Sequence, residues 1–365
     1  MTCNRVQRSS AACGGRYRHS WLAESHRLGV KTSFSVKRFA AMSCSGGSNN
    51  KNHRNQGHSI ALYLDLYIEF PVIKPSPRIV FVIPYFGQWP FWMPFFLESC
   101  RRNPDIDWLL FSDCGVPDNL PPNVTIQSIS FGDYCRTVSE RLNIHFAPKA
   151  AYKLCDIKPA LGYIHEDRLQ GYDFWAFGDI DLVYGNLRSY FTAERLSRYD
   201  LFSTHERRVA GHLCLMRNTR CKRELFMKIE NWQQRFTDDQ HHALDEGAFS
   251  RIFLWRKNFP KPLFDLVGKF NPLRRTSDFT EAFSTPGGCI KWHDGTENFP
   301  GQWFWKNGQL TNDRDGDHTF PYFHFVCWKR NEWAALPIPD PVTVQRLAAE
   351  PAWIIDATGF HRGEL

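Results

Sequence analysis

The chain has few of the features that mark membrane, disulfide-linked or zinc-binding proteins. No apolar run reaches the roughly 18–20 residues that a membrane helix needs, and the stretch from Ile60 to Ile68 is interrupted by Asp65. The 11 cysteines are odd in number and form no C-x-x-C pair, which disfavours a cysteine-ligated zinc site. Several, such as Cys214, lie in apolar patterns, where a thiol behaves as a small hydrophobe. A reducing compartment fits this usage best.

Acidic residues are almost missing from the first 60 positions. Residues 1–60 contain ten Lys and Arg but one acid, Glu24, whereas the remainder of the chain has a net charge of −2. The net charge of +7 therefore comes from the leader, and the near-neutral body gives no sign of nucleic-acid binding.

The leader is rich in Ser, Arg, Gly and Asn and lacks the apolar centre of a secretory signal. Its composition resembles that of a plastid or mitochondrial transit peptide. The alternatives are a plain basic extension or a true start at Met42, which would leave the protein in the cytoplasm. In each case we expect residues 1–60 to be disordered and exclude them from the fold.

From Pro75 onward the hydrophobic pattern becomes regular, and the 42% hydrophobic content supports a sizeable core. The early alternation of strands and helices predicts an α/β domain over residues 76–335, with a mostly parallel sheet and antiparallel additions toward the C-terminus. The dipeptide Asn307-Gly308 indicates a type I′ hairpin. The Pro-rich residues 336–365 are expected to form a C-terminal tail. Strands are expected at 78–83, 107–111, 124–129, 172–178, 200–204, 211–216 and 320–326, and helices up to 102 and at 134–142, 152–169, 221–232 and 246–255.

The acidic pair Asp179 and Asp181 follows the apolar run 172–178. Side chains alternate along a strand, so both carboxylates point the same way at its carboxyl end, where open α/β sheets bind ligands. Two neighbouring carboxylates repel one another unless a cation lies between them, and hard oxygen ligands favour Mg²⁺ or Mn²⁺. A D-x-D alone is common in solvated turns, so a cation site that holds a diphosphate needs support from elsewhere.

One segment before the acidic pair and one after it offer further groups that could contact a substrate. In the stretch 152–159, Asp156 could contact a sugar hydroxyl and Lys158 could contact phosphate oxygens; the alternative is an ordinary exposed helix turn. Gly211 could let the backbone approach a bound sugar, while the neighbouring His212 is more often a structural residue.

Two C-terminal segments complete the set. Asp245 and Glu246 could bind substrate hydroxyls or act as a general base, or they could simply cap the following helix. His324, between aromatic residues at a strand end, could complete the ligand set of the cation, or be an ordinary core histidine. Lys329 could then meet the diphosphate.

This ordered set resembles glycosyltransferases of the GT-A fold, most closely an uncharacterised, largely bacterial family with Y-K-x-x-D-x-K-P and G-D-x-D-x-x-x-G stretches. The resemblance covers residues 78–330 and implies a Rossmann-like mixed sheet flanked by helices. It also implies that Asp181 and His324 bind the cation, with Asp179 on the ribose or the cation. Asp156 would hold the donor sugar, and Tyr85 would pack on the nucleobase.

The sequence thus predicts a metal-dependent transferase that moves a sugar from a nucleoside-diphosphate sugar to a glycan or another hydroxyl acceptor, with Mn²⁺ or Mg²⁺ as cofactor. One alternative is a non-catalytic carbohydrate-binding or degenerate transferase domain. An aspartyl-nucleophile phosphatase also places D-x-D after a buried strand. That class carries the motif near the start of its domain, however, and here about a hundred residues of strands and helices come first.

Overall fold

The computed structural model describes residues 76–256, 258–288 and 290–363. The basic leader, and with it the prediction of disorder or targeting, lies outside the described residues. Among the described residues, no helix combines the length and the apolar character that crossing a membrane requires.

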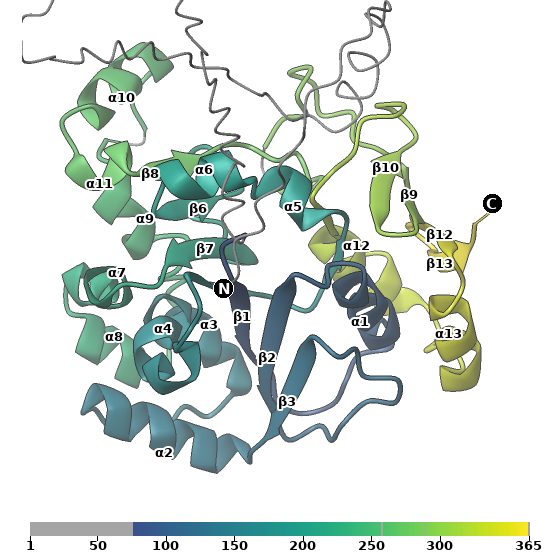
Figure 1. Ribbon diagram of the computed structural model, residues 1–365, viewed down its shortest axis with the longest axis horizontal. Coiled ribbons are helices and arrows are strands. Elements are labelled where there is room, and N and C mark those ends of the chain that lie inside the picture. The colour runs from purple at the N-terminus through teal and green to yellow at the C-terminus, as the bar shows by residue number, and fades with distance from the viewer. Residues whose placement is uncertain (1–75, 257, 289, 364–365) are drawn as a thin grey trace, which may run out of the picture. The chain divides into compact units, whose positions relative to one another are not determined.

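Seven strands form the central sheet, in the order β3-β2-β1-β4-β7-β6-β8 (Figure 1). Pairing is parallel from β3 through β4, antiparallel on both sides of β7, and parallel again between β6 and β8. The carboxyl ends of β1, β4 and β6 therefore share one edge. The strands are β1 Ile79–Pro84, β2 Ile106–Ser112, β3 Val124–Ser128, β4 Phe174–Gly178, β6 Leu201–Ser203, β7 Leu213–Arg217 and β8 Ser277–Phe279.

The central strands are apolar on both faces because helices cover both. Val82 and Phe177 belong to the hydrophobic cluster on one face, whereas Phe81 and Ala176 belong to the cluster on the other. This is why β1 and β4 read as continuous apolar runs rather than alternating ones. Helices α2 Phe131–Leu142, α3 Leu154–Ile157, α4 Leu161–Ile164 and α9 Ala248–Phe253 pack on the first face, and α1 Met93–Arg101, α5 Leu187–Tyr190 and α6 Ala193–Arg198 on the second.

The helix predicted over 152–169 is a broken series of short turns. It consists of η2 Ala151–Lys153, α3, η3 Lys158–Ala160, α4 and η4 Glu166–Leu169. Pro159 lies in the first turn of η3, where its missing N–H costs no helical hydrogen bond. The predicted helix over 221–232 is also split, into α7 Arg220–Arg223, η5 Leu225–Lys228 and the start of α8 Trp232–Thr237.

A second, antiparallel sheet lies toward the C-terminus, in the order β10-β9-β12-β13. Its strands are β9 Gln302–Lys306, β10 Gln309–Asn312, β12 Ala352–Asp356 and β13 Gly359–Arg362. The predicted hairpin is confirmed, since Asn307 and Gly308 join β9 to β10 with φ of 50° and 83°. The fold class predicted from the sequence, a mixed α/β sheet flanked by helices with a C-terminal antiparallel addition, is confirmed.

The sequence analysis predicts a simple tail over residues 336–365, but residues 336–363 are folded. They form α13 Pro341–Ala348 and the β12-β13 hairpin, which pairs with β9 (Figure 1). The indole of Trp353 stacks on that of Trp305 with ring centroids 3.8 Å apart, and both side chains are fully buried. The C-terminal segment therefore belongs to the core of the second sheet.

The last predicted strand, 320–326, is shorter in the structure. Only β11 Tyr322–His324 is extended, and it pairs antiparallel with β5 Leu182–Tyr184, placing His324 opposite Leu182. The chain then turns into α12 Val326–Arg330, and η6 Trp333–Ala335 follows. The remaining helices are α10 Lys261–Gly268 and α11 Pro272–Arg275.

Candidate metal and substrate site

The acidic pair lies in the tight connection between β4 and β5. Asp179 donates its backbone N–H to the carbonyl of His212 (3.1 Å), while the side chain of Ile180 is buried. This connection leaves the carboxylates of Asp179 and Asp181 at the carboxyl edge of the sheet, as strand alternation predicts. Asp181 is 5% exposed, whereas the side chain of Asp179 is about one third exposed.

The pairing of β11 with β5 brings His324 to this acidic pair. Its Nε2 lies 3.5 Å from Oδ2 of Asp181, and one ligand atom each from Asp179, Asp181 and His324 lie within 4.8 Å of one another. Two carboxylates and an imidazole suit a divalent cation such as Mn²⁺ or Mg²⁺. The structure thus brings together the three residues that the sequence analysis chose as metal ligands.

A hydrogen-bonded network holds the imidazole of His324 in place. Thr285 Oγ1 lies 3.4 Å from Nδ1 of His324. The rings of His212 and His324 pack against each other with centroids 4.2 Å apart. His212 Nε2 is 2.7 Å from the hydroxyl of Tyr322, which donates to Thr204. Burial lowers the pKa of His212, so this ring is neutral at neutral pH. The sequence analysis ranked His212 low and missed Thr285, because neither lies in the same local motif as His324.

Lys329 approaches the same carboxylate from α12. Its Nζ lies 2.5 Å from Oδ2 of Asp181 and 5.8 Å from the ring centroid of Trp92. Burial alone would raise the pKa of Asp181, but the His324 imidazole and the Lys329 ammonium outweigh it, so the pKa lies well below its usual value. Asp181 is therefore ionised and able to bind a cation across the physiological pH range.

Lys158 connects the acidic pair to a second acidic group. Its buried Nζ donates to Oδ1 of Asp179 (2.6 Å) and to the carbonyl of Gly211 (2.9 Å), and it lies 3.7 Å from Oδ2 of Asp245. Burial alone would lower the pKa of Lys158, but Asp179 and the other acidic neighbours raise it overall. The sequence analysis assigned Lys158 to phosphate; here its ammonium is engaged by the site's own oxygens.

Gly211 is needed because Asp245 lies directly over it. A Cβ atom at Gly211 would lie 2.4 Å from Oδ2 of Asp245, far inside van der Waals contact. The close approach predicted at this glycine is therefore present, and it is made by a carboxylate of the chain itself.

Asp245 and Glu246 do not cap the helix that follows them. The N-cap of α9 is Gly247 and has no side-chain hydrogen bond, so the capping alternative is wrong. Glu246 instead accepts from the N–H of Gly211 (3.3 Å) and lies 3.4 Å from Nη1 of Arg208. Burial raises the pKa of Asp245 to about 7 even though Lys158 opposes the shift, so this carboxyl can hold or release a proton near neutral pH.

Asp156 is fully buried. Its carboxylate accepts from the backbone N–H groups of His242 (3.0 and 3.1 Å) and Leu244 (3.1 Å), and it lies 3.1 Å from Nζ of Lys153. These bonds occupy the carboxylate, so the structure does not support direct contact with a sugar. Asp156 instead positions the segment that carries Asp245.

Tyr85 lies in the loop between β1 and α1. Its ring stacks on that of Trp89 with centroids 5.4 Å apart, and its hydroxyl donates to the carbonyl of Gln88. Partial burial raises the pKa of Tyr85, and the nearby groups Cys114 and Asp181 raise it further. Tyr85 and Trp89 therefore form a half-buried aromatic pair, and the predicted contact of Tyr85 with a nucleobase stays a prediction.

Together these features describe an α/β protein with a candidate divalent-cation site at the carboxyl edge of its sheet. The model of the Family of unknown function (DUF6625) matches residues 81–335, and the chain belongs to that family. A search of curated proteins gave no match.

Several solved structures show a distant likeness to the chain. Mouse xyloside xylosyltransferase 1, in its apo form, is 10% identical, with a TM-score of 0.38 over 69% of this chain and 99% of that one. The galactosyltransferase LgtC, in complex with donor and acceptor sugar analogs, is 10% identical with a TM-score of 0.28, over 46% and 71%. The glycosyltransferase GlyE of Streptococcus pneumoniae TIGR4 is 11% identical with a TM-score of 0.25, over 59% and 57%. These similarities are too low to support an assignment.

Proposed function

We propose that this protein is a metal-dependent glycosyltransferase that moves a sugar from a nucleoside-diphosphate sugar to an acceptor hydroxyl. The observation that carries the proposal is the convergence of Asp179, Asp181 and His324, which come from two distant parts of the sequence. A bound divalent cation would neutralise negative charge on the leaving diphosphate, which is the main electrostatic demand of such a transfer.

The residues around this cluster support particular roles. Asp181 and His324 would hold the cation, and Asp179 would bind the cation or the ribose. Lys329, whose Nζ lies 2.5 Å from Oδ2 of Asp181, would add a positive charge for the diphosphate. The half-buried Tyr85, stacked on Trp89, would receive the nucleobase.

Asp245 and Glu246 are the candidates for contact with the acceptor. The pKa of Asp245 is raised to about 7 by burial, which suits a group that takes a proton from an acceptor hydroxyl near neutral pH. The side chain of Glu246 is about one third exposed, so it could accept from sugar hydroxyls in addition to its contacts with Gly211 and Arg208. Gly211 and Lys158 hold this pair close to Asp179.

Calorimetric titration with uridine and guanosine diphosphates, with and without Mn²⁺, tests the proposal. The native protein should bind at least one of them in the presence of Mn²⁺ and lose that binding with EDTA. Asp181→Asn should abolish binding without unfolding the protein. The matched control is Asp167→Asn, an exposed carboxylate paired with Arg141. The proposal fails if no nucleotide or nucleotide sugar shows metal-dependent affinity.

The main alternative is a carbohydrate-binding domain without catalytic activity. Its support is that the Lys329 ammonium itself pairs with the carboxylate of Asp181. Under that reading, glycans would bind without nucleotide or metal, and Asp181→Asn would leave their binding unchanged. An aspartyl phosphatase would instead form a phosphoaspartate at Asp179, which mass spectrometry after trapping would detect.

A further inference from the structure

Helix α10 turns large apolar side chains toward solvent. Leu263, Leu266 and Phe270 are 45%, 51% and 75% exposed, whereas Phe264 is buried and anchors the helix. Residues three and four apart lie on the same side of a helix, so Leu263 and Leu266 share one face, and Phe270 follows just beyond the helix end. Soluble proteins seldom expose such a group of side chains unless something binds to it.

The same segment is strongly basic. Residues 255–276 contain six Lys and Arg and one acid, Asp265, although residues 61–365 as a whole have a net charge of −2. Lys261 is ion-paired with Glu206, but Lys269, directly after α10, and Arg275, the last residue of α11, are exposed. Lys269, three residues after Leu266 and directly before Phe270, therefore borders the apolar face.

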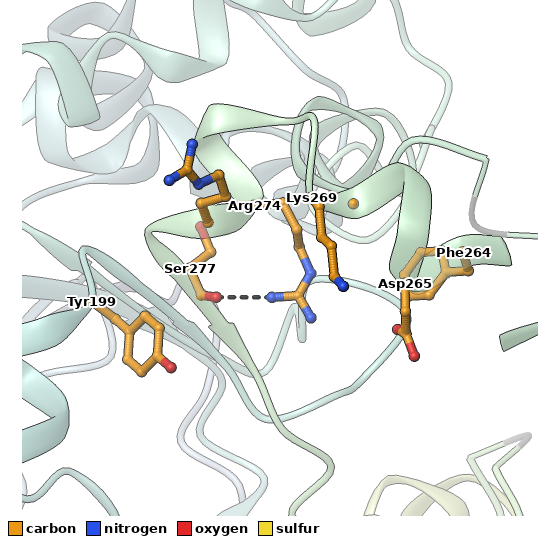
Figure 2. A pocket seen from close by; sticks show the side chains of 8 residues that line it. Tyr199, Phe264, Asp265, Lys269, Arg274 and Ser277 are labelled. Carbon is orange, nitrogen blue, oxygen red and sulfur yellow. Dashed lines mark hydrogen bonds between the residues drawn. The ribbon is translucent and has the colours of Figure 1, made fainter. Parts of the chain in front are cut away.

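A pocket of about 250 Å³ lies along α10 on the side that carries Phe264, Asp265 and Gly268. Figure 2 shows Lys269 and Arg274 extending toward the same opening, with Asp265 across from them. Arg274 donates Nη1 to the carbonyl of Ser277 (2.9 Å), which fixes its guanidinium at the wall. The pocket thus offers an ammonium and a guanidinium to an anionic group of phosphate size.

We propose that α10 and this pocket dock the protein on an anionic membrane surface. Leu266 and Phe270 enter the boundary between headgroups and acyl chains, while Lys269, Arg274 and Arg275 contact lipid phosphates. Exposed apolar side chains bordered by Lys and Arg are the combination that binds such surfaces. The helix lies at the periphery of the described fold (Figure 1).

Docking in this way leaves the candidate metal site accessible. Tyr199, which lines the pocket, precedes β6, and Ser277 begins β8. Both strands run parallel to β4, so the pocket lies at the amino edge of the sheet and Asp181 at the carboxyl edge. The docking surface is thus separate from the proposed catalytic function and does not depend on it.

Co-sedimentation of the full chain with vesicles tests the proposal. Native protein should partition more strongly into phosphatidylcholine vesicles that contain phosphatidylserine than into phosphatidylcholine alone, and salt should weaken the difference. Each cation near the surface contributes roughly five-fold, so Lys269→Glu with Arg275→Glu should lower the partition by roughly 25-fold or more. The matched control reverses the charges of Arg136 and Lys149, two exposed cations elsewhere on the fold, by substituting Glu at both positions. The basic leader is identical in every variant, so the ratio of the partition between variants measures the contribution of Lys269 and Arg275.

Photocrosslinking gives a local readout that the leader does not affect. With p-benzoylphenylalanine at position 270, light should attach lipid to the protein, whereas the same group at position 338 should attach little, although Ile338 is 87% exposed. Equal vesicle binding by the two double variants, or no lipid attached from position 270, would overturn the proposal. Either result would leave an acidic protein surface as the occupant of this face.

Discussion

Replacing Lys158 with methionine should destabilise the protein strongly, because the lysine is a buried cation between two carboxylates. Its Nζ lies 2.6 Å from Asp179 and 3.7 Å from Asp245, and it also donates to the carbonyl of Gly211. Methionine has a similar length but no charge. Removing one partner of a buried ion pair leaves an uncompensated charge and costs about 3–5 kcal/mol of unfolding free energy.

The cost should depend on pH in a defined direction. Burial raises the pKa of Asp245 to about 7, so at pH 5.5 this carboxyl is protonated in the native state and needs the lysine less. At pH 8.5 it is ionised, and Lys158→Met then leaves two buried or half-buried negative charges unpaired. The destabilisation should therefore be larger at pH 8.5 than at pH 5.5.

Urea denaturation in EDTA, followed by tryptophan fluorescence at the two pH values, measures both effects. The control is Lys149→Met, an exposed lysine paired with Asp239, which should change stability little at either pH. A change below about 0.5 kcal/mol for Lys158→Met at pH 8.5, or a larger cost at pH 5.5, would refute the account of this network.

Two further predictions concern the same acidic group. Gly211→Ala should lower the free energy of unfolding by about 1–3 kcal/mol through overpacking, because its Cβ would lie 2.4 Å from Oδ2 of Asp245. The control is Gly132→Ala in α2, where open space surrounds the new Cβ, and it should be neutral or slightly stabilising in the same urea assay. The raised pKa of Asp245 stabilises the fold fully below pH about 3.8, and this contribution disappears as the pH rises through about 7. Asp245→Asn should therefore flatten the loss of stability between pH 4 and pH 7 in EDTA; an unchanged slope would mean that Asp245 is ionised throughout.

Local sequence patterns were sufficient for the acidic pair and for the central strands. Asp179 and Asp181 follow an apolar strand. Because side chains alternate along a strand, both carboxylates point the same way at its carboxyl end, which is the edge where open α/β sheets bind ligands. The Asn307-Gly308 turn was equally predictable, since few residues other than Asn and Gly adopt positive φ at both positions.

Long-range contacts account for what the sequence could not show. Asp156 was expected at a sugar, but the segment around His242 and Leu244 folds over it and occupies its carboxylate. No local pattern indicates that two segments so far apart will meet. The same holds for Thr285, which approaches His324 only in the folded chain.

The C-terminal hairpin is a different case, because its signal was present. Residues 352–355 are apolar and include the β-branched Ile354 and Ile355, and Gly359, with φ of 122°, follows a short turn. The prolines of this segment favoured the prediction of a tail, although Pro337 and Pro339 lie before α13, Pro341 lies in its first turn, and Pro351 directly precedes β12. The short apolar run that predicts a strand counted for less than the high proline content of residues 336–365.

The central claim is that Asp179, Asp181 and His324 hold one divalent cation. Electron paramagnetic resonance of Mn²⁺ titrated into the full chain, with and without uridine diphosphate, measures this directly. We expect one bound Mn²⁺ per chain in the native protein and in Asp167→Asn, and none in Asp181→Asn or His324→Gln. Stoichiometric Mn²⁺ binding that survives both substitutions, or its absence from the native protein with nucleotide present, would contradict the account.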